Sequence, residues 1–268
     1  SQHCHTLKLS HPILTNHDLE KLRRLSWGDF LATTLPMFWR PDGGGRELER
    51  ALAGLCRRAS LAIKSGYTVL ILSDRGIEQD WAPIPSLLAL TAVHNHLVRE
   101  KTRTQAGIIV ESGEPREVMH FALLLGYGAS AVNPYLAIET IEDLHRKGWL
   151  PEGMSLEAAV HNYEKAINKG LLKVLSKMGI STLQSYQGAQ AFEAIGLNRS
   201  VVDQYFTGTP SRIEGVGLEV LAQEVKARHD RAFSAVSEAE CELESGGQYH
   251  YRVEGEYHLF NPDTISKL

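Results

Sequence analysis

The sequence has few cysteines, and their spacing suits neither cross-linking nor metal binding. Its 268 residues include three cysteines, at positions 4, 56 and 241. An odd and widely spaced set supports neither a disulfide framework nor a four-ligand zinc site. His3-Cys4-His5 brings ligating residue types together but offers no fourth ligand beside them. We therefore expect no metal site in this chain and a reducing, cytoplasmic environment.

Long hydrophobic runs and a surplus of basic residues are also missing. No apolar run approaches the roughly 18 residues that a membrane-spanning helix needs, and residues 1–20 lack the apolar core of a signal peptide. The formal net charge is −4, whereas nucleic-acid-binding domains usually carry a basic surplus. These absences predict a protein that binds neither a membrane nor a nucleic acid.

The common glycine-rich and nucleophile motifs are absent as well. The chain contains no G-x-G-x-x-G, Walker A or G-x-S-x-G sequence. Gly43-Gly44-Gly45 precedes a predicted helix, but no strand of the right kind leads into it, as a phosphate-binding loop would require. From motifs alone, the sequence predicts a globular domain without an identifiable cofactor site.

What the sequence does contain is a regular alternation of strand and helix patterns. Short apolar runs bounded by turn residues predict buried parallel strands at 67–72, 107–111, 129–133 and 181–185. Between them the apolar residues follow the helical period. Strands that alternate with helices form a parallel sheet with right-handed crossovers. Four such units are too few for a closed eight-stranded barrel, so we expect an α/β fold with an incomplete barrel or an open sheet.

Charge and composition indicate a boundary near the C-terminal end. Residues 234–258 contain six glutamates and one arginine, together with serines and the pair Gly246-Gly247. Such a stretch is typical of a solvated linker. We therefore expect a folded domain over 1–233, an acidic linker over 234–248 and a connecting segment over 249–268.

The predicted strands end in polar residues, at the edge where α/β proteins place their chemistry. These strand-end residues are Asp74, Arg75, Glu111, Asn133 and Ser185. They are weak candidates for a binding site, because polar residues in such places also form turns and cap helices without any ligand. Both interpretations stay open from the sequence.

A small anion is one ligand class that this edge suggests. Gly113-Glu114-Pro115 opens a predicted helix, and the amino end of a helix attracts negative charge. Glu111 and Glu114 crowd the same place with carboxylates, which weakens the hypothesis. An anion- or phosphate-binding α/β domain is therefore the alternative to a domain that has no ligand of its own.

Two long stretches carry a resemblance to a known family. Residues 73–136 begin SDRGIEQDW and end GASAVNPYL, and residues 163–214 contain KGLLKVLSKMGISTLQSY. Both resemble the central domain of the glutamate synthase large chain, in its ferredoxin-dependent and NADPH-dependent forms. LKLSHPILTNHDLEKLR resembles the start of that domain, and GEYHLFNPDTISKL resembles its connection into the following flavin domain. Gln187 departs from the residue usual in the family, and 234–248 matches poorly.

The resemblance implies a function for a whole enzyme rather than for this chain alone. The family converts glutamine and 2-oxoglutarate into two glutamates. An amidotransferase domain releases ammonia, which passes through a tunnel to a flavin domain that holds FMN and a 3Fe-4S cluster. The central domain between them resembles a degenerate flavin barrel, an incomplete parallel βα barrel with its helices outside. The resemblance thus implies no catalytic residue, cofactor or metal in this chain, and contacts with the amidotransferase and flavin domains.

The segment before the first predicted helix is where the resemblance places the mouth of the tunnel. Thr15 and Asn16 are the expected tunnel-lining residues, because hydroxyl and amide groups can pass ammonia along by hydrogen bonds. Either side chain can instead cap the helix, with Thr15 and Asp18 as a box-like pair. The family also implies a cytoplasmic protein, or one of the plastid stroma in a photosynthetic eukaryote.

Overall fold

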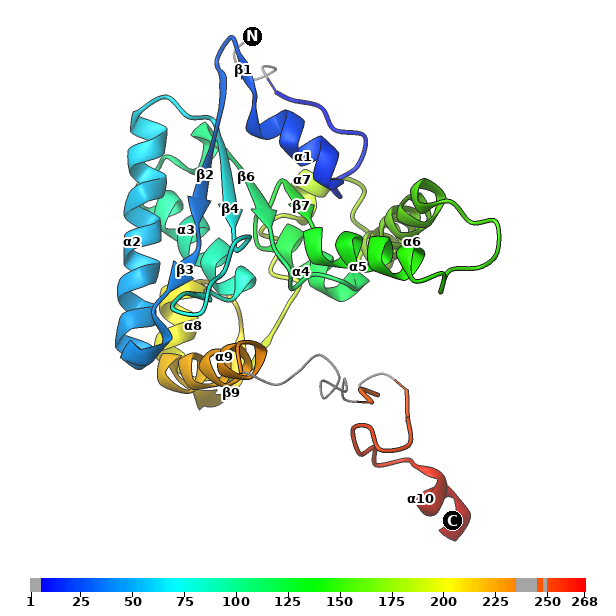
Figure 1. The fold of residues 1–268 in the computed structure, drawn as a ribbon. Helices are drawn as coiled ribbons and strands as arrows, with labels where there is room; N and C mark the ends of the chain where they lie inside the picture. Colours follow the sequence, from blue (N-terminus) through cyan, green and yellow to red (C-terminus); the bar gives the residue numbers. More distant parts are fainter. Residues whose placement is uncertain (1–5, 235–244, 248–249) are drawn as a thin grey trace. The chain divides into compact units, whose positions relative to one another are not determined.

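The computed structural model describes residues 6–234, 245–247 and 250–268, which belong to two units, Ser1–Asp230 and Arg231–Leu268 (Figure 1). The larger unit contains the sheet and the helices around it. The smaller unit contains helix α10 (Pro262–Lys267), whose first turn is capped by the side chain of Asn261. Most of the predicted acidic linker over 234–248, and the cysteines at 4 and 241, lie outside the described residues.

A five-stranded, mostly parallel sheet forms the centre of the larger unit. Its order is β1-β2-β4-β6-β7, and every pair is parallel except the antiparallel pair of β1 and β2. The strands are β1 (Ser26–Trp27), β2 (Phe30–Pro36), β4 (Val69–Ser73), β6 (Gly107–Glu111) and β7 (Ala131–Asn133). The register aligns their carboxyl ends, because Ser73 is paired with Glu111 and Glu111 with Asn133.

Three helices connect consecutive parallel strands and cover one face of the sheet (Figure 1). They are α2 (Gly44–Lys64), α3 (Ser86–Arg99) and α4 (Val118–Gly126). Because side chains alternate between the faces of a strand, Leu70 and Leu72 of β4 pack in the same core as the apolar residues of these helices. The parallel strands follow one another in chain order, as in a βα barrel, and the expected incomplete barrel with outer helices is confirmed.

Helix α1 (Asn16–Arg23) covers the opposite face of the sheet, which would be the interior of a closed barrel. Leu14 and Leu19 pack there in one cluster with Val69, Ile71 and other residues of the sheet. The residues before α1 also bond to the outer edge of β7. Within this segment Leu14 N donates to the carbonyl of Val132 at 2.9 Å, and Val132 N donates to the carbonyl of Pro12 at 2.8 Å. The N-terminal segment therefore occupies both the interior face and the edge where a barrel would continue.

The remaining elements of the larger unit pack around this layered centre. Two short strand pairs accompany the main sheet, the antiparallel pair β3 (Phe38–Trp39) and β5 (Ala82–Pro83), and the parallel pair β8 (Ala194–Leu197) and β9 (Ser211–Val216). The other helices are α5 (Tyr135–Arg146), α6 (Leu156–Lys177), α7 (Leu183–Tyr186), α8 (Arg199–Tyr205) and α9 (Leu218–Ala232), with single turns at Pro41–Gly43 and Arg103–Gln105.

Three expectations about local structure need correction. The strand predicted at 181–185 is wrong: Thr182 caps helix α7 there, and its hydroxyl accepts a hydrogen bond from Ser185 N at 3.2 Å. Strand β2, which the periodicity missed, replaces it in the sheet. The helix expected to open at Gly113-Glu114-Pro115 begins instead at Val118.

Among the described residues, no helix has the length and hydropathy of a membrane span.

Candidate functional site

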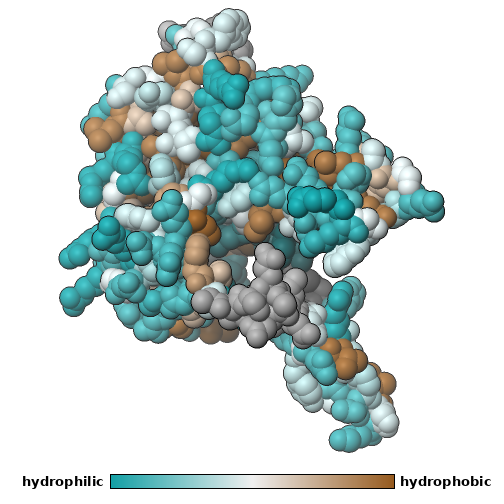
Figure 2. All heavy atoms as spheres, in the orientation of Figure 1, coloured by the Kyte–Doolittle hydropathy of each residue, from teal (hydrophilic) through white to brown (hydrophobic). Residues whose placement is uncertain are grey.

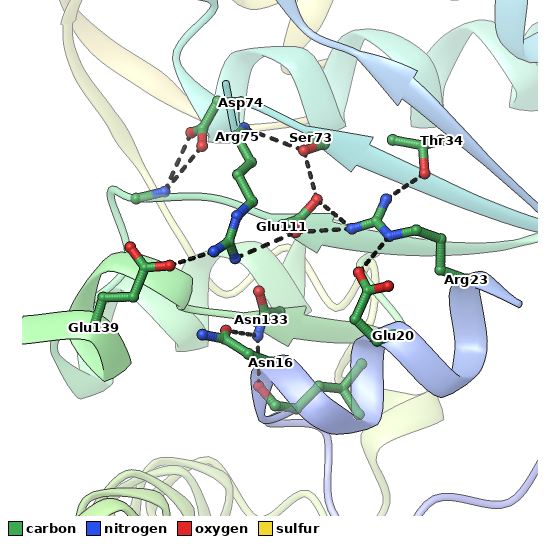
Figure 3. Close-up of polar contacts among 12 residues, drawn as sticks. Asn16, Glu20, Arg23, Thr34, Ser73, Asp74, Arg75, Glu111, Asn133 and Glu139 are labelled. Atoms are coloured by element: carbon green, nitrogen blue, oxygen red, sulfur yellow. Dashed lines mark hydrogen bonds and ion pairs between the residues drawn. The ribbon is translucent and has the colours of Figure 1, made fainter. Parts of the chain in front are cut away.

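Polar side chains meet at the aligned carboxyl ends of β4, β6 and β7 (Figure 3). Four of the five residues predicted for this edge are found there: Asp74, Arg75, Glu111 and Asn133. Ser185 is not, because it lies in α7, where its hydroxyl accepts a hydrogen bond from Thr182. The register of a parallel sheet is thus enough to bring residues from three separate stretches of sequence to one place.

Glu111 is the centre of this polar group and is only 2% exposed. Nη2 of Arg23 donates to both of its carboxylate oxygens at 2.8 Å, and the hydroxyl of Ser73 donates to one of them at 2.5 Å. Arg75 adds a longer ion pair at 3.9 Å. A buried carboxylate is costly unless it is paired and hydrogen-bonded, and Glu111 has both kinds of partner inside the protein.

Arg23 reaches this carboxylate from the last turn of α1, on the interior face of the sheet (Figure 3). Its Nε donates to Glu20 at 2.8 Å, and its Nη1 donates to the hydroxyl of Thr34 on β2. One guanidinium therefore ties the end of the helix to two strands. Sequence reasoning missed Arg23, since it lies far from the strand ends in the chain and only the position of α1 brings it close.

Arg75 is held on the other side of Glu111 by residues of α5. Its guanidinium bonds to the carboxylate of Glu139 and lies over the ring of Tyr135, 4.8 Å from the ring centre. Both partners come from the helix that follows β7. The two arginines of the site are therefore both paired with carboxylates of the protein.

Asp74 has the most perturbed carboxyl of the group. It is 3% exposed and accepts hydrogen bonds from the hydroxyl of Ser112 at 2.5 Å and from Gly113 N at 3.0 Å. Burial raises its pKa to about 6, and these two hydrogen bonds oppose that rise without cancelling it. The same burial, with the charge of Asp74, raises the pKa of the neighbouring Tyr135 phenol. Asp74 thus closes the turn after β6 at a cost in electrostatic free energy.

Asn133 connects the strand ends to the N-terminal segment. Its side chain is fully buried, and its amide nitrogen donates to the carbonyl of Leu14 at 2.9 Å and to Oδ1 of Asn16 at 3.0 Å. Thr15, between these two, caps α1: its hydroxyl accepts from Asp18 N at 3.0 Å and donates to the Asp18 carboxylate at 2.7 Å. The capping arrangement expected for Thr15 is present, and both Thr15 and Asn16 are half-buried.

The carboxylate of Glu114, beside the place where an anion was expected, turns to the start of α3 rather than to that of α4. Glu114 accepts hydrogen bonds from the backbone nitrogen of Ser86 at 2.7 Å and from the hydroxyl of Ser86 at 2.6 Å, so it caps the start of α3.

Within the described residues, no group of three or more His, Cys, Asp or Glu side chains is arranged to hold a metal ion. Cys56 is a buried residue of α2, and its burial raises the pKa of its thiol to about 11.

Two hollows border the N-terminal segment. One has a volume of about 370 Å³ and lies between residues 10–12, α4, α6 and α7, with Leu171, Leu175 and Tyr186 in its walls. The other, of about 310 Å³, is lined by residues 8–11, 13 and 14 and by the face of α1 that includes Asp18 and Lys21. Ser10 and His11 line both. The segment that leads to Thr15 therefore runs between open spaces and the packed sheet.

The chain is similar to one family and to several long proteins. The family model "Glutamate synthase central domain" matches residues 1–198. The chain is 44% identical over 262 residues to the glutamate synthase [NADPH] large chain of Bacillus subtilis, and the matched region covers 98% of this chain and 17% of that protein. It is 41% identical over 273 residues to the ferredoxin-dependent glutamate synthase 1, chloroplastic/mitochondrial, of Arabidopsis thaliana, and here the matched region covers 97% of this chain and 16% of that protein. The chain thus spans about one sixth of these relatives.

Solved structures with a similar arrangement are more distant. The flavin-binding domain of baker's yeast flavocytochrome b2 aligns over 71% of this chain and 43% of its own, with a TM-score of 0.40 and 15% identity. A DHODH from Eimeria tenella in complex with ferulenol aligns over 60% of this chain and 38% of its own, with a TM-score of 0.38 and 18% identity.

Proposed function

Because the chain belongs to the glutamate synthase central-domain family, we propose that it is the non-catalytic central domain of a glutamate synthase large chain. In this role it holds the enzyme's amidotransferase and flavin domains in place and lines the passage through which ammonia moves between them. The whole enzyme converts glutamine and 2-oxoglutarate into two glutamates. FMN and the 3Fe-4S cluster belong to the flavin domain, and this chain supplies no group to either.

The occupied interior face of the sheet is the observation that carries the non-catalytic part of the proposal. In a βα barrel, ligands bind at the carboxyl ends of the strands. Here α1 packs on that face, and Arg23 and Arg75 are paired with Glu111 and Glu139 at those strand ends. Asp74 is bonded to the turn after β6. These groups bind one another, so they serve to fix α1 and α5 on the sheet rather than to receive a substrate.

The N-terminal segment supports the second part of the proposal, the passage for ammonia. Thr15 and Asn16 are half-buried polar residues at the point where an extended segment turns into α1. Hollows of about 370 and 310 Å³ border the residues that lead to them. Hydroxyl and amide groups can both donate and accept hydrogen bonds, as a path for ammonia requires.

The other end of the chain is consistent with a domain that is joined to a further one. Within the smaller unit, the described residues Tyr257, Leu259 and Phe260 are 78%, 79% and 65% exposed. Figure 2 shows hydrophobic side chains at the surface of this part of the chain. Exposed apolar residues in a cluster are typical of surfaces that contact other protein. We propose that 1–233 form the central domain, 234–248 a linker and 249–268 the connection into the flavin domain.

A substitution at Thr15 tests the passage in a full-length large chain that carries this domain. Thr15→Trp should suppress glutamine-dependent glutamate formation and spare ammonia-dependent formation, because one large side chain blocks a channel for so small a molecule. Thr15→Val keeps the volume and removes the hydroxyl, so it should cost about 1 kcal/mol of cap stability without obstruction. Full glutamine-dependent turnover in the tryptophan variant, with no release of free ammonia, would contradict the proposal.

A further inference from the structure

Asn133 makes hydrogen bonds that the stability of the sheet does not explain. It ends β7, where the two preceding residues are apolar, and its side chain has no exposed surface. Its oxygen Oδ1 is buried and has no hydrogen-bond partner within the described part of the chain. A buried acceptor without a donor lowers stability, and an apolar residue of the same size would avoid that loss. The reason for an asparagine here must therefore lie with its two donors.

Both donors of Asn133 act on the residues that flank Thr15. One amide hydrogen goes to the carbonyl of Leu14 and the other to Oδ1 of Asn16, at 2.9 and 3.0 Å. Leu14 is also the last residue of the segment that bonds to β7, since its backbone nitrogen donates to Val132. Beyond Leu14 the chain leaves the edge of the sheet and turns into α1. Asn133 therefore holds the turn at the two points between which Thr15 lies.

The hydroxyl of Thr15 cannot perform this task itself. Its bonds go to the backbone nitrogen and the carboxylate of Asp18, within the first turn of the same helix. They fix Thr15 to α1 but not to the sheet. The side chain of Asn133 supplies that link from β7, across 117 to 119 positions of the sequence.

We propose that Asn133 is a positioning residue for the ammonia passage: it holds the turn from Leu14 to Asn16 against the sheet so that the passage stays closed to solvent. This inference rests on the function proposed above. Without these two hydrogen bonds the turn would open more often, and ammonia released from glutamine would escape before it reacts. Ammonia supplied from solution does not need the passage, so its use should be unaffected.

The experiment uses a full-length large chain that carries this domain, with the variant Asn133→Leu. Three quantities are measured: the rate of glutamine hydrolysis, the rate of glutamate formation from glutamine or from saturating ammonia, and the free ammonia released per glutamine hydrolysed. We expect the released fraction of ammonia to rise at least about fivefold, because the loss of one hydrogen bond changes a population by about that factor and the variant loses two. Hydrolysis and ammonia-dependent formation should stay at the level of the unmodified enzyme.

Two further variants make the outcome unambiguous. Thr91→Val removes a buried hydroxyl that donates to the carbonyl of Leu88 within α3, away from the N-terminal segment, and should leave the released fraction unchanged. Asn16→Leu removes one of the two acceptors at a half-buried position. It should raise the released fraction in the same direction, and it supplies the readout if Asn133→Leu does not fold.

Each other result has a definite meaning. If Asn133→Leu retains its ammonia while Thr15→Trp loses glutamine-dependent synthesis, the passage stands and the role of Asn133 is refuted. If all rates of Asn133→Leu fall in parallel with an unchanged released fraction, the residue is merely structural and the inference also fails. If neither Thr15→Trp nor Asn133→Leu alters the coupling of hydrolysis to synthesis, the proposed function itself is wrong.

Discussion

Replacing Arg23 by methionine should destabilise the larger unit strongly, because it leaves the carboxylate of Glu111 buried without its main partner. Breaking a buried ion pair from one side typically costs about 3–5 kcal/mol. Two features reduce that figure here. Ser73 and Arg75 still contact Glu111, and the Arg23 side chain is 27% exposed, so water screens part of the interaction. We therefore expect a loss of about 2–3 kcal/mol in the free energy of unfolding.

The assay is urea denaturation of the 268-residue chain at pH 7, with two comparisons. Arg50→Met breaks an exposed pair with Glu47 at 3.3 Å, in which the arginine is 77% exposed, and should cost less than about 0.5 kcal/mol. The double variant Arg23→Met with Glu111→Gln removes the stranded charge and should recover most of the loss. A cost for Arg23→Met as small as that for Arg50→Met would refute the tie between α1 and the sheet on which the proposed function depends.

Two other properties of the isolated chain are open to direct measurement. The pKa of Asp74 is raised to about 6 from an ordinary value near 4, so its contribution to stability is fully present below pH 4 and is lost as the pH rises through 6. Relative to the Asp74→Asn variant, the free energy of unfolding of the unmodified chain should therefore fall by about 2 kcal/mol between pH 4 and pH 7. An equal pH dependence in both proteins would be evidence against the burial of a charged carboxyl. Titration with FMN should leave the flavin fluorescence unquenched, because α1 fills the interior face of the sheet, whereas saturable quenching at micromolar FMN would contradict a flavin-free domain.

The parts of the fold that could be predicted from sequence are those whose burial is complete. Every residue of β4 is buried, so its apolar run is continuous and easily recognised. Most of β2 is only half-buried, and its two central threonines interrupt the apolar pattern, so the strand was missed. The predicted strand at 181–185 failed for the opposite reason. There Thr182 caps helix α7 and Ser185 lies within it, and small or β-branched side chains do not by themselves distinguish a helix start from a strand.

The polar site at the strand ends could also be predicted only in part. Asp74, Arg75, Glu111 and Asn133 could be brought together in advance, since the edge of a parallel sheet collects whatever follows its strands. Their partners Arg23 and Glu139 come from α1 and α5, and no local pattern tells which helix face will lie over the strand ends. The sequence therefore predicts where polar groups gather, but their pairing, which argues against a ligand there, depends on tertiary packing.

Isotope retention tests most directly whether this domain encloses a passage for ammonia. A full-length large chain that carries the domain is given glutamine labelled with ¹⁵N in the amide group, 2-oxoglutarate and excess unlabelled ammonium. The ¹⁵N content of the glutamate formed from 2-oxoglutarate is then measured by mass spectrometry. We predict that the label is retained in the unmodified enzyme and is largely replaced by unlabelled nitrogen in the Thr15→Trp variant. Equal dilution of the label in both enzymes would contradict the account.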